Sequence, residues 1–264
     1  MERRHVALTI AGYDSSAGAG IQADLKTFAA FEVYGASAIT AVTAQNTLGV
    51  TAIEELGTGV IAAQIDAVVG DLGVAAVKTG MLSSTPIIET VAERLEAHGL
   101  ERVVVDPVMV AKGGERLLRE DAVAALTRLL LPLALVLTPN AGEAEVLSGR
   151  PVTTMEEAKE AARAIAALGP RYVVVKGGHF GTDAVDVLFD GERFAELPAK
   201  RVPTTSTHGT GCTFSSAIAA GLASGKGVGE AVADAKAYVT EAIGCAFPVG
   251  AGHGPVHHFF RWWR

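Results

Sequence analysis

The chain has 264 residues, of which 49% are hydrophobic and 19% are charged, and its formal net charge is -7. This length and composition suffice for one large core and predict a single α/β domain over residues 1–264. The acidic balance, without a run of Lys or Arg, argues against binding to nucleic acid or to an anionic membrane surface.

Targeting signals are not evident. The most apolar segment, 129–137, is too short to span a bilayer, and the charged N-terminus lacks the apolar stretch of a signal peptide. The two cysteines, Cys212 and Cys245, are too few for a disulfide framework. We therefore expect a cytoplasmic protein.

Continuously apolar runs alternate with helical patterns along the first two thirds of the chain. Such runs are typical of strands buried on both faces, and their alternation with helices predicts a mainly parallel sheet with right-handed crossovers. The expected strands lie near 5–11, 36–44, 74–79, 102–106, 133–138 and 171–176, and the expected helices near 19–33, 59–70, 85–98, 118–130, 141–148 and 155–168.

The rhythm changes after Gly178. Residues 184–197, "AVDVLFDGERFAEL", form two short alternating runs around Asp190-Gly191, which predicts a hairpin. Two helices follow, near 210–224 and 228–246. With helices above and below a mainly parallel sheet, the predicted fold is a three-layer αβα sandwich.

The first expected strand runs into a glycine-rich loop, "GYDSSAGAGIQAD", at 12–24. Gly18, Gly20 and Ala23 fit G-x-G-x-x-A, the fingerprint of a dinucleotide-binding fold. That fingerprint requires an acidic residue at the end of the second strand, but 38–47 reads "AITAVTAQNT". The sequence therefore disfavours a nucleotide-dependent oxidoreductase.

Polar residues and glycines gather at the carboxyl ends of the expected strands. Ligands bind at that edge of open parallel sheets, so the clustering predicts an enzyme, although any single stretch could be turn chemistry. The stretches are 12–20, 45–46, 78–81, 106–109, 138–140 and 176–179.

A second glycine turn, 208–212 ("HGTGC"), opens a helix of small residues. Free N–H groups at a helix start bind anions, and Gly209 and Gly211 let the backbone close on a phosphate. The alternative is an ordinary helix capped by Thr210. Cys212 falls in the first turn, where the dipole lowers a thiol pKa and favours a general base or proton relay, although a lone cysteine is more often buried and inert. No Walker A motif is present.

Asp106, Asn140 and Glu143 supply two carboxylates and an amide, which suit a water-rich Mg²⁺ site that bridges phosphates. Asn140 and Glu143 equally fit an N-cap and capping box, and both interpretations can hold together. Lys176, which follows three valines, is suited to neutralise transferring phosphoryl oxygens. The alternative is an exposed lysine at a strand end.

Six stretches follow one another along the chain: "TIAGYDSSAGAGIQADLKTFAAFEVYGASAITAVTAQNTLGV", "AVKTGML", "VVVDPVMVAKGG", "LTPNAGEAEVL", "VVVKGGH" and "STHGTGCTFSSAIAAGLASG". In this order they resemble the hydroxymethylpyrimidine/phosphomethylpyrimidine kinase family of thiamine biosynthesis. The glycine turn is shared with many sugar and vitamin kinases, whereas "GIQADLKTF", "TAQNT" and "DPVMVAK" are more specific. The resemblance covers roughly residues 5–245.

The resemblance implies a ribokinase-like fold with ATP and Mg²⁺ as cofactors. The implied reaction transfers a phosphoryl group to the hydroxymethyl group of 4-amino-5-hydroxymethyl-2-methylpyrimidine, and a second transfer to the monophosphate gives the diphosphate. By motif, Gln45 resembles the residue that hydrogen-bonds the pyrimidine, and Cys212 stands where many sugar kinases of this fold carry an Asp base. The other implied pocket walls are Gly12, Asp24, Met81 and Val108.

The implied nucleotide lies over the C-terminal half, with its γ-phosphate at 209–212. Its expected phosphate ligands are Asn140, Lys176, Thr210 and Gly211. Lys112, in a glycine-containing loop, is expected to cover the site and to hold the substrate's own phosphate in the second step; the alternative is an ordinary exposed loop. Family members commonly self-associate, so we expect a homodimer, with the apolar 36–56 region as its surface.

Two residues depart from the family pattern, which usually reads Gly-Ser-Asp-Ser-Ser-Gly-Gly-Ala-Gly in the first loop. Tyr13 replaces the first Ser, and Ala17 replaces a Gly. These differences bear on loop shape and substrate preference rather than on the fold. The main alternative function is a pyridoxine/pyridoxal kinase on the same fold. A non-catalytic vitamin-binding protein is a further alternative, which the intact phosphate-site residues disfavour.

Overall fold

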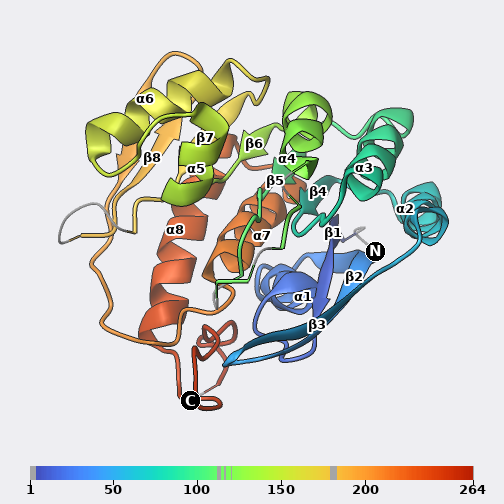
Figure 1. Cartoon of the computed structure of the whole chain (residues 1–264). Coiled ribbons are helices and arrows are strands. Elements are labelled where there is room, and N and C mark those ends of the chain that lie inside the picture. Colours follow the sequence, from blue (N-terminus) through green and yellow to red (C-terminus); the bar gives the residue numbers. More distant parts are fainter. Residues whose placement is uncertain (1–3, 112–113, 116, 120, 179–182, 264) are drawn as a thin grey trace.

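The computed structural model describes residues 4–111, 114–115, 117–119, 121–178 and 183–263. Within them the strands form one nine-stranded sheet in the order β3-β2-β1-β4-β5-β6-β7-β8-β9 (Figure 1). The strands are β1 (Val6–Asp14), β2 (Tyr34–Asn46), β3 (Gly49–Glu55), β4 (Ala76–Thr79), β5 (Val103–Val105), β6 (Val136–Leu137), β7 (Tyr172–Val175), β8 (Asp186–Phe189) and β9 (Phe194–Leu197).

The middle of the sheet is parallel and its edges are antiparallel. Strands β2, β1, β4, β5, β6 and β7 pair in parallel. At one edge β3 runs antiparallel to β2, and at the other β8 and β9 form the hairpin predicted around Asp190-Gly191. The prediction of a mainly parallel sheet is confirmed.

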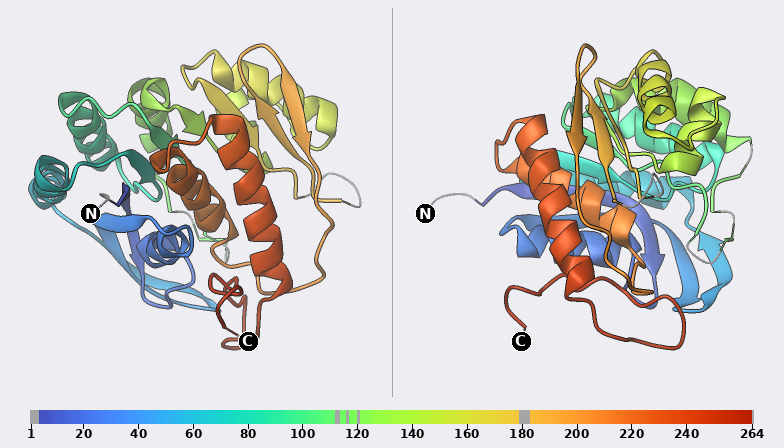
Figure 2. Two further views of the ribbon diagram at one scale, coloured as in Figure 1. Left: turned by 180° about the vertical axis from the view of Figure 1, so that it is seen from behind. Right: turned by 90° about the vertical axis from the view of Figure 1, so that its left-hand side faces the viewer.

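Helices cover both faces of the sheet (Figure 2). Alternate strand residues face opposite layers: Leu8 and Ile10 pack with α2 to α6, whereas Ala7 packs with α1, α7 and α8. The three-layer αβα sandwich is therefore confirmed. The helices are α1 (Gly20–Ala30), α2 (Thr58–Leu72), α3 (Thr85–Ala97), α4 (Ala122–Ala125), α5 (Ala141–Ser148), α6 (Met155–Ala166), α7 (Thr210–Ala223) and α8 (Val228–Gly244).

The helix predicted over 118–130 is shorter than expected. Helix α4 begins only at Ala122, and its continuation, Leu126–Leu130, is a π-helical turn. The preceding amides bond elsewhere, because Leu118 N–H donates to the Met109 carbonyl and Arg119 N–H to the Ser83 carbonyl. These tertiary hydrogen bonds replace the first helical turn.

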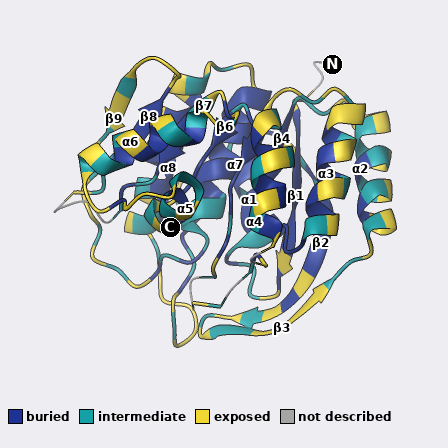
Figure 3. Cartoon of the chain, turned by 45° about the horizontal axis from the view of Figure 1, so that its top comes forward, coloured by how far each residue is buried: buried dark blue, intermediate teal, exposed yellow. Residues whose placement is uncertain are grey.

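Strand β3 was not predicted. It forms with β2 a two-stranded ribbon that extends beyond the body of the molecule (Figure 1) and is largely exposed (Figure 3). Neither face of β3 is buried, so its sequence lacks the apolar alternation by which strands are recognised. The ribbon carries Gln45 near its tip and so brings it to the edge of the sheet where the parallel strands end.

The C-terminal segment crosses from the tip of this ribbon to the second glycine turn. The amides of Gly252 and His253 donate to Thr47, and His208 exchanges backbone hydrogen bonds with Gly254 and Val256. Beyond it, aromatic residues pack on α8, with the rings of Phe260 and Tyr238 5.5 Å apart. Among the described helices, none is long and apolar enough to cross a membrane.

Candidate active site

One cavity of about 910 Å³ lies where the parallel strands end. Residues from six neighbouring strands and the loops that follow them line it, and both glycine turns contribute to its wall. The structure therefore brings together the stretches that the sequence places at the sheet edge. The predicted residues that line the cavity are Gly12, Gln45, Met81, Asp106, Val108, Asn140, Glu143, Lys176, Gly209, Thr210, Gly211 and Cys212.

The wall at the N-terminal end is shaped by a bulge in β2, which has one extra residue opposite Gly12 of β1. The register between β1 and β2 shifts between Ala11 and Tyr13, as is common beside active sites. A Cβ atom at Gly12 would lie 2.7 Å from Cε of Met81, so the glycine makes room for the methionine. Met81 and Val108 give this end an apolar lining beside the amide of Gln45.

The Asp14 carboxylate, 3% exposed, holds the opening loop together. Oδ1 accepts hydrogen bonds from the amide and hydroxyl of Ser16, and Oδ2 accepts from the Ala19 amide and from Nε2 of His208, all at 2.8 Å. Burial alone would raise the pKa of Asp14, but these hydrogen bonds outweigh it and hold the pKa at about 2. Sequence reasoning missed both Asp14 and His208, whose only signal is their place inside the two glycine motifs.

The second glycine turn presents free backbone amides to the cavity. Gly209 is the N-cap of α7 with φ 77°, and a Cβ there would collide with the carbonyl of Gly18. Within the described residues, the amides of Gly211 and Cys212 have no hydrogen-bond acceptor. This is the arrangement expected of an anion site at a helix start.

Thr210 does not cap α7, so that alternative is wrong. Its hydroxyl donates to the Thr207 carbonyl at 2.8 Å, and the N-cap position belongs to Gly209, which has no side chain. The hydroxyl oxygen of Thr210 can still accept a hydrogen bond at the cavity wall.

Cys212 lies in the first turn of α7, but the expectation that its thiol pKa is lowered is wrong. Burial raises the pKa of Cys212 to about 11, even though the Lys78 ammonium and a hydrogen bond from the Gly20 amide favour the thiolate. The hydration that the sulfur loses on burial outweighs these two favourable interactions. The structure therefore holds Cys212 as a thiol at neutral pH.

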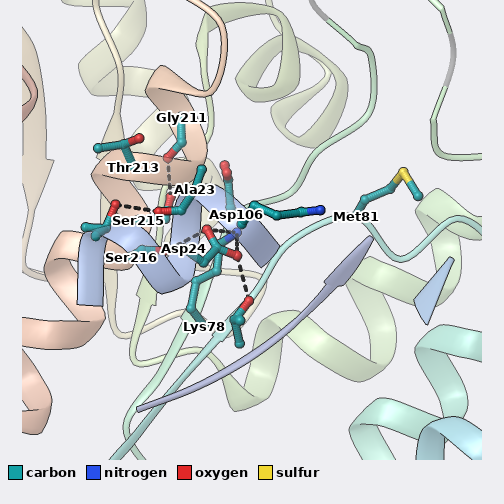
Figure 4. A network of polar contacts seen from close by, with 12 residues as sticks. Ala23, Asp24, Lys78, Met81, Asp106, Gly211, Thr213, Ser215 and Ser216 are labelled. Carbon is teal, nitrogen blue, oxygen red and sulfur yellow. Dashed lines mark hydrogen bonds and ion pairs between the residues drawn. The ribbon is translucent and has the colours of Figure 1, made fainter. Parts of the chain in front are cut away.

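Asp24 does not line the cavity, so its predicted place in the pocket wall is wrong. It is fully buried and accepts from Lys78 Nζ at 2.8 and 2.9 Å, and Thr9 and Ser216 donate to it at 2.6 Å (Figure 4). Asp24 reaches the site only through Lys78, which does border the cavity. The sequence analysis placed Lys78 in the 78–81 stretch at the sheet edge but gave it no role, although a lysine inside the apolar strand "AAVKTGML" is the same signal that identified Lys176.

Lys176 pairs with Asp106 beneath the phosphate turn. Its Nζ lies 3.0 Å from Asp106 Oδ1, and a Cβ at Gly211 would lie 3.3 Å from that Nζ. Burial alone would lower the pKa of Lys176, but the carboxylates of Asp106 and Glu143 raise it above the usual value. The alternative of an exposed lysine is wrong, and a permanent cation stands next to the free amides.

Asn140 and Glu143 form the capping box of α5. Asn140 Oδ1 accepts from the Glu143 amide at 2.9 Å, and Glu143 Oε2 accepts from the Asn140 amide at 2.8 Å. Burial raises the pKa of Glu143 to about 7, and Lys176 opposes the shift. The capping interpretation is therefore confirmed.

The far end of the cavity was not identified from the sequence. Helix α8 lines it with Val239, Thr240 and Ile243, opposite the loop 199–205. Lys236 is paired there with Asp186 at 2.8 Å. An apolar slot with polar edges suits a flat heterocyclic base. Lys112, the expected second phosphate ligand, lies outside the described residues.

Comparisons with known proteins agree with this geometry. The family model described as phosphomethylpyrimidine kinase matches residues 14–257. The chain is 56% identical to the hydroxymethylpyrimidine/phosphomethylpyrimidine kinase of Rhizobium meliloti, over 98% of each sequence.

Solved structures share the whole fold. The phosphomethylpyrimidine kinase of Clostridium difficile 630 superposes with a TM-score of 0.82 at 46% identity, covering 91% of this chain and 100% of that one. The ADP complex of a Bacillus subtilis pyridoxal kinase superposes with a TM-score of 0.91 at 45% identity, covering 97% of each chain. The fold is therefore ribokinase-like.

Proposed function

The chain belongs to the phosphomethylpyrimidine kinase family and is a small-molecule kinase, and on that premise we propose that it phosphorylates 4-amino-5-hydroxymethyl-2-methylpyrimidine. ATP is the donor, and a second transfer to the monophosphate gives the diphosphate used in thiamine biosynthesis. One observation carries the proposal: the free amides of α7 open onto the same cavity as the Gln45 wall.

The two ends of the cavity suit the two substrates. The flat pyrimidine ring packs between Met81 and Val108, and Gln45 hydrogen-bonds its polar edge. The base of ATP occupies the slot along α8, which leads its phosphates to the start of α7. This arrangement aligns the alcohol with the γ-phosphate, and phosphoryl-transfer catalysis depends on such positioning together with electrostatic stabilisation.

In the transfer, the hydroxymethyl oxygen forms a bond to the γ-phosphorus while the bond from that phosphorus to ADP breaks. The amides of Gly211 and Cys212, together with Lys176, stabilise charge on the phosphoryl oxygens. Cys212 is a thiol in the resting site, so it first loses its own proton to solvent, and the resulting thiolate then accepts the hydroxyl proton. The buried ammonium of Lys78 favours that form.

Mg²⁺ fits the site through few protein ligands. Within the described residues no group of three or more His, Cys, Asp or Glu side chains could hold a metal ion. Lys176 engages Asp106 Oδ1 and leaves Oδ2 facing the phosphate turn, while Asn140 and Glu143 are engaged in the capping box. We assign Asp106 as the direct ligand, with Asn140 and Glu143 acting through water. The ion would neutralise phosphate charge, as Mg²⁺ does when shared with nucleotide phosphates.

The test is product analysis by mass spectrometry with the pyrimidine alcohol and ATP·Mg²⁺. We expect the monophosphate first and the diphosphate after longer incubation. Pyridoxal is assayed in parallel, because a pyridoxal kinase is similar in fold and sequence. Faster turnover of pyridoxal would favour that second function, and a lack of turnover with both substrates would refute the kinase proposal.

We infer further that residues 1–264 act as one kinase domain, because both hydrophobic clusters pack on the same sheet.

The ribbon of β2 and β3 exposes Val42, Leu48 and Ile53, and we propose it as the surface of a homodimer. Light scattering on the protein eluted from a size-exclusion column measures its molar mass. We expect the mass of two chains, and the mass of one chain would contradict the proposal. Both cysteines are free, which supports a reducing, cytoplasmic compartment.

A further inference from the structure

The imidazole of His208 must donate a hydrogen from Nε2. This nitrogen lies 2.8 Å from Oδ2 of Asp14, in a pair whose side chains are 7% and 3% exposed. An ionised carboxylate only accepts hydrogen bonds, so the nitrogen that faces it carries a hydrogen. This holds for the neutral Nε2–H tautomer and for the imidazolium alike.

The same nitrogen lies 3.4 Å from the terminal nitrogen of Gln45. Both nitrogens carry hydrogens in this orientation, and two donors cannot form a hydrogen bond with each other. A half-turn of the amide exchanges its oxygen and nitrogen and leaves its shape unchanged. With Oε1 turned toward His208, the N–H of the imidazole is shared between two acceptors, Asp14 and Gln45.

A second contact leads independently to the same orientation. The hydroxyl of Thr43 lies 2.9 Å from the carbonyl oxygen of Tyr13 and 3.2 Å from Oε1 of Gln45. The hydroxyl has one hydrogen, and the carbonyl can only accept it. The lone pairs of Thr43 therefore face Gln45 and require a donor there, which is Nε2 after the half-turn.

The imidazole of His208 is held in a fixed position, so it can determine the orientation of the Gln45 amide. A Cβ at Gly18 would collide with Cδ2 of its ring, so the opening loop lies directly against the imidazole. On the backbone side, His208 N–H donates to the Gly254 carbonyl at 3.0 Å, and the Val256 amide donates to the His208 carbonyl at 3.4 Å. The ring and its main chain are thus fixed from two directions.

We propose that Asp14 and His208 are positioning residues that fix the orientation of the Gln45 amide, with Oε1 toward His208 and Nε2 toward Thr43. One N–H and one carbonyl lone pair of Gln45 then remain for a ligand. A ring nitrogen next to an amino group, as in a 4-aminopyrimidine, complements that acceptor–donor pair. The inference deepens the proposed function and rests on it for the identity of the substrate.

The first test is the tautomer of His208, read from the ¹⁵N shifts of its ring in a long-range ¹H–¹⁵N spectrum of the protein without added substrate. We expect a protonated Nε2. A neutral ring protonated only at Nδ1 would overturn the proposal, since Nε2 would then accept from the amide. This measurement is decisive even if the protein phosphorylates neither the pyrimidine nor pyridoxal.

The second test is a double-mutant cycle on KM for the pyrimidine alcohol. In the presence of Gln45, His208→Asn is expected to raise KM about tenfold, the usual loss for one buried hydrogen bond. In a Gln45→Ala background the same change is expected to alter KM less than about twofold, because its effect passes through Gln45. Equal effects in the two backgrounds would show that His208 acts independently of Gln45.

A matched pair of variants separates the hydrogen bond from folding. The amide nitrogen of Gln reaches the place of the imidazole Nε2, whereas that of Asn stops nearer the main chain. His208→Gln keeps an N–H donor at that place, whereas His208→Asn loses it. We therefore expect His208→Gln to keep KM within about threefold of the wild type. If both variants unfold at the same urea concentration yet raise KM equally, the proposal is wrong.

Discussion

Two glycine-rich turns open helices at the same cavity, yet a carboxylate of the chain's own accepts backbone amides in only one of them. In the opening loop, the Asp14 carboxylate takes the amides of Ser16 and Ala19. In the turn before α7, the amides of Gly211 and Cys212 have no acceptor among the described residues. The first turn carries its own anion, and the second is left to bind an external one. A glycine pattern alone does not distinguish the two, because the nearest carboxylate decides.

The largest expected difference between the two turns is in catalysis, because the proposed proton acceptor, Cys212, lies in the second turn. Cys212→Ala is expected to lower kcat about a thousandfold, the usual range for loss of a proton acceptor, with unfolding free energy within about 1 kcal/mol of the wild type. Steady-state turnover and urea denaturation measure the two quantities. Cys245→Ala, at an exposed cysteine, serves as the control. Near-normal turnover by Cys212→Ala would remove the proton-acceptor role.

The opening loop, by contrast, is expected to respond in stability. Gly20 has φ 58°, and a Cβ there would collide with the Gly12 carbonyl. Gly20→Ala is expected to cost about 3 kcal/mol of unfolding free energy, from left-handed strain and backbone overlap. Gly73→Ala is the matched control, since Gly73 has φ 67° and open space around it, so that only about 1 kcal/mol is lost. Equal losses in urea denaturation would show that the overlap does not matter.

The thiol of Cys212 tests whether the second turn activates its own residue. Its pKa is raised from 9.0 to about 11, so the reactive thiolate is scarce below pH 11. In a Cys245→Ser background, the rate of alkylation by iodoacetamide should rise about tenfold for each pH unit from 8 to 10. A plateau below pH 9 would mean that the helix start outweighs burial, as the sequence alone suggested.

The smallest expected effect lies at Ala17, where the related sequences usually carry glycine. Ala17 has φ 60°, a conformation that costs a residue with a Cβ about 1 kcal/mol. Ala17→Gly should therefore raise the unfolding free energy by about that amount. Ala29→Gly, at an exposed position in α1, should lower it by a similar amount. A loss in both variants would place Ala17 outside the strained region.

The order of strands and helices could be read from the sequence because most strands are buried on both faces and leave unbroken apolar runs. Strand β3 could not, since it is exposed on a ribbon and has no such run. The polar residues at the predicted strand ends also predicted where the cavity lies. The sequence does not reveal which side chains there hydrogen-bond to one another.

Three site residues illustrate that limit. Asp24 belongs to a motif that matches the family pattern. Its carboxylate, however, accepts hydrogen bonds from Lys78, Thr9 and Ser216 and does not line the cavity. The thiol pKa of Cys212 depends on burial, which a helix position does not reveal. His208 became visible as a site residue only when the fold brought it to Asp14.

The pairing of Asp14 with His208 also bears on how the molecule folds. The two residues are 194 positions apart in the chain, so their contact closes a very long loop. Long-range contacts of this kind form slowly, because the entropy of loop closure is lost before the contact repays it. During refolding, helical circular dichroism should therefore return before kinase activity does. We therefore expect the active site to be the last part of the fold to be completed, so that a chain with most of its helices is still without catalysis.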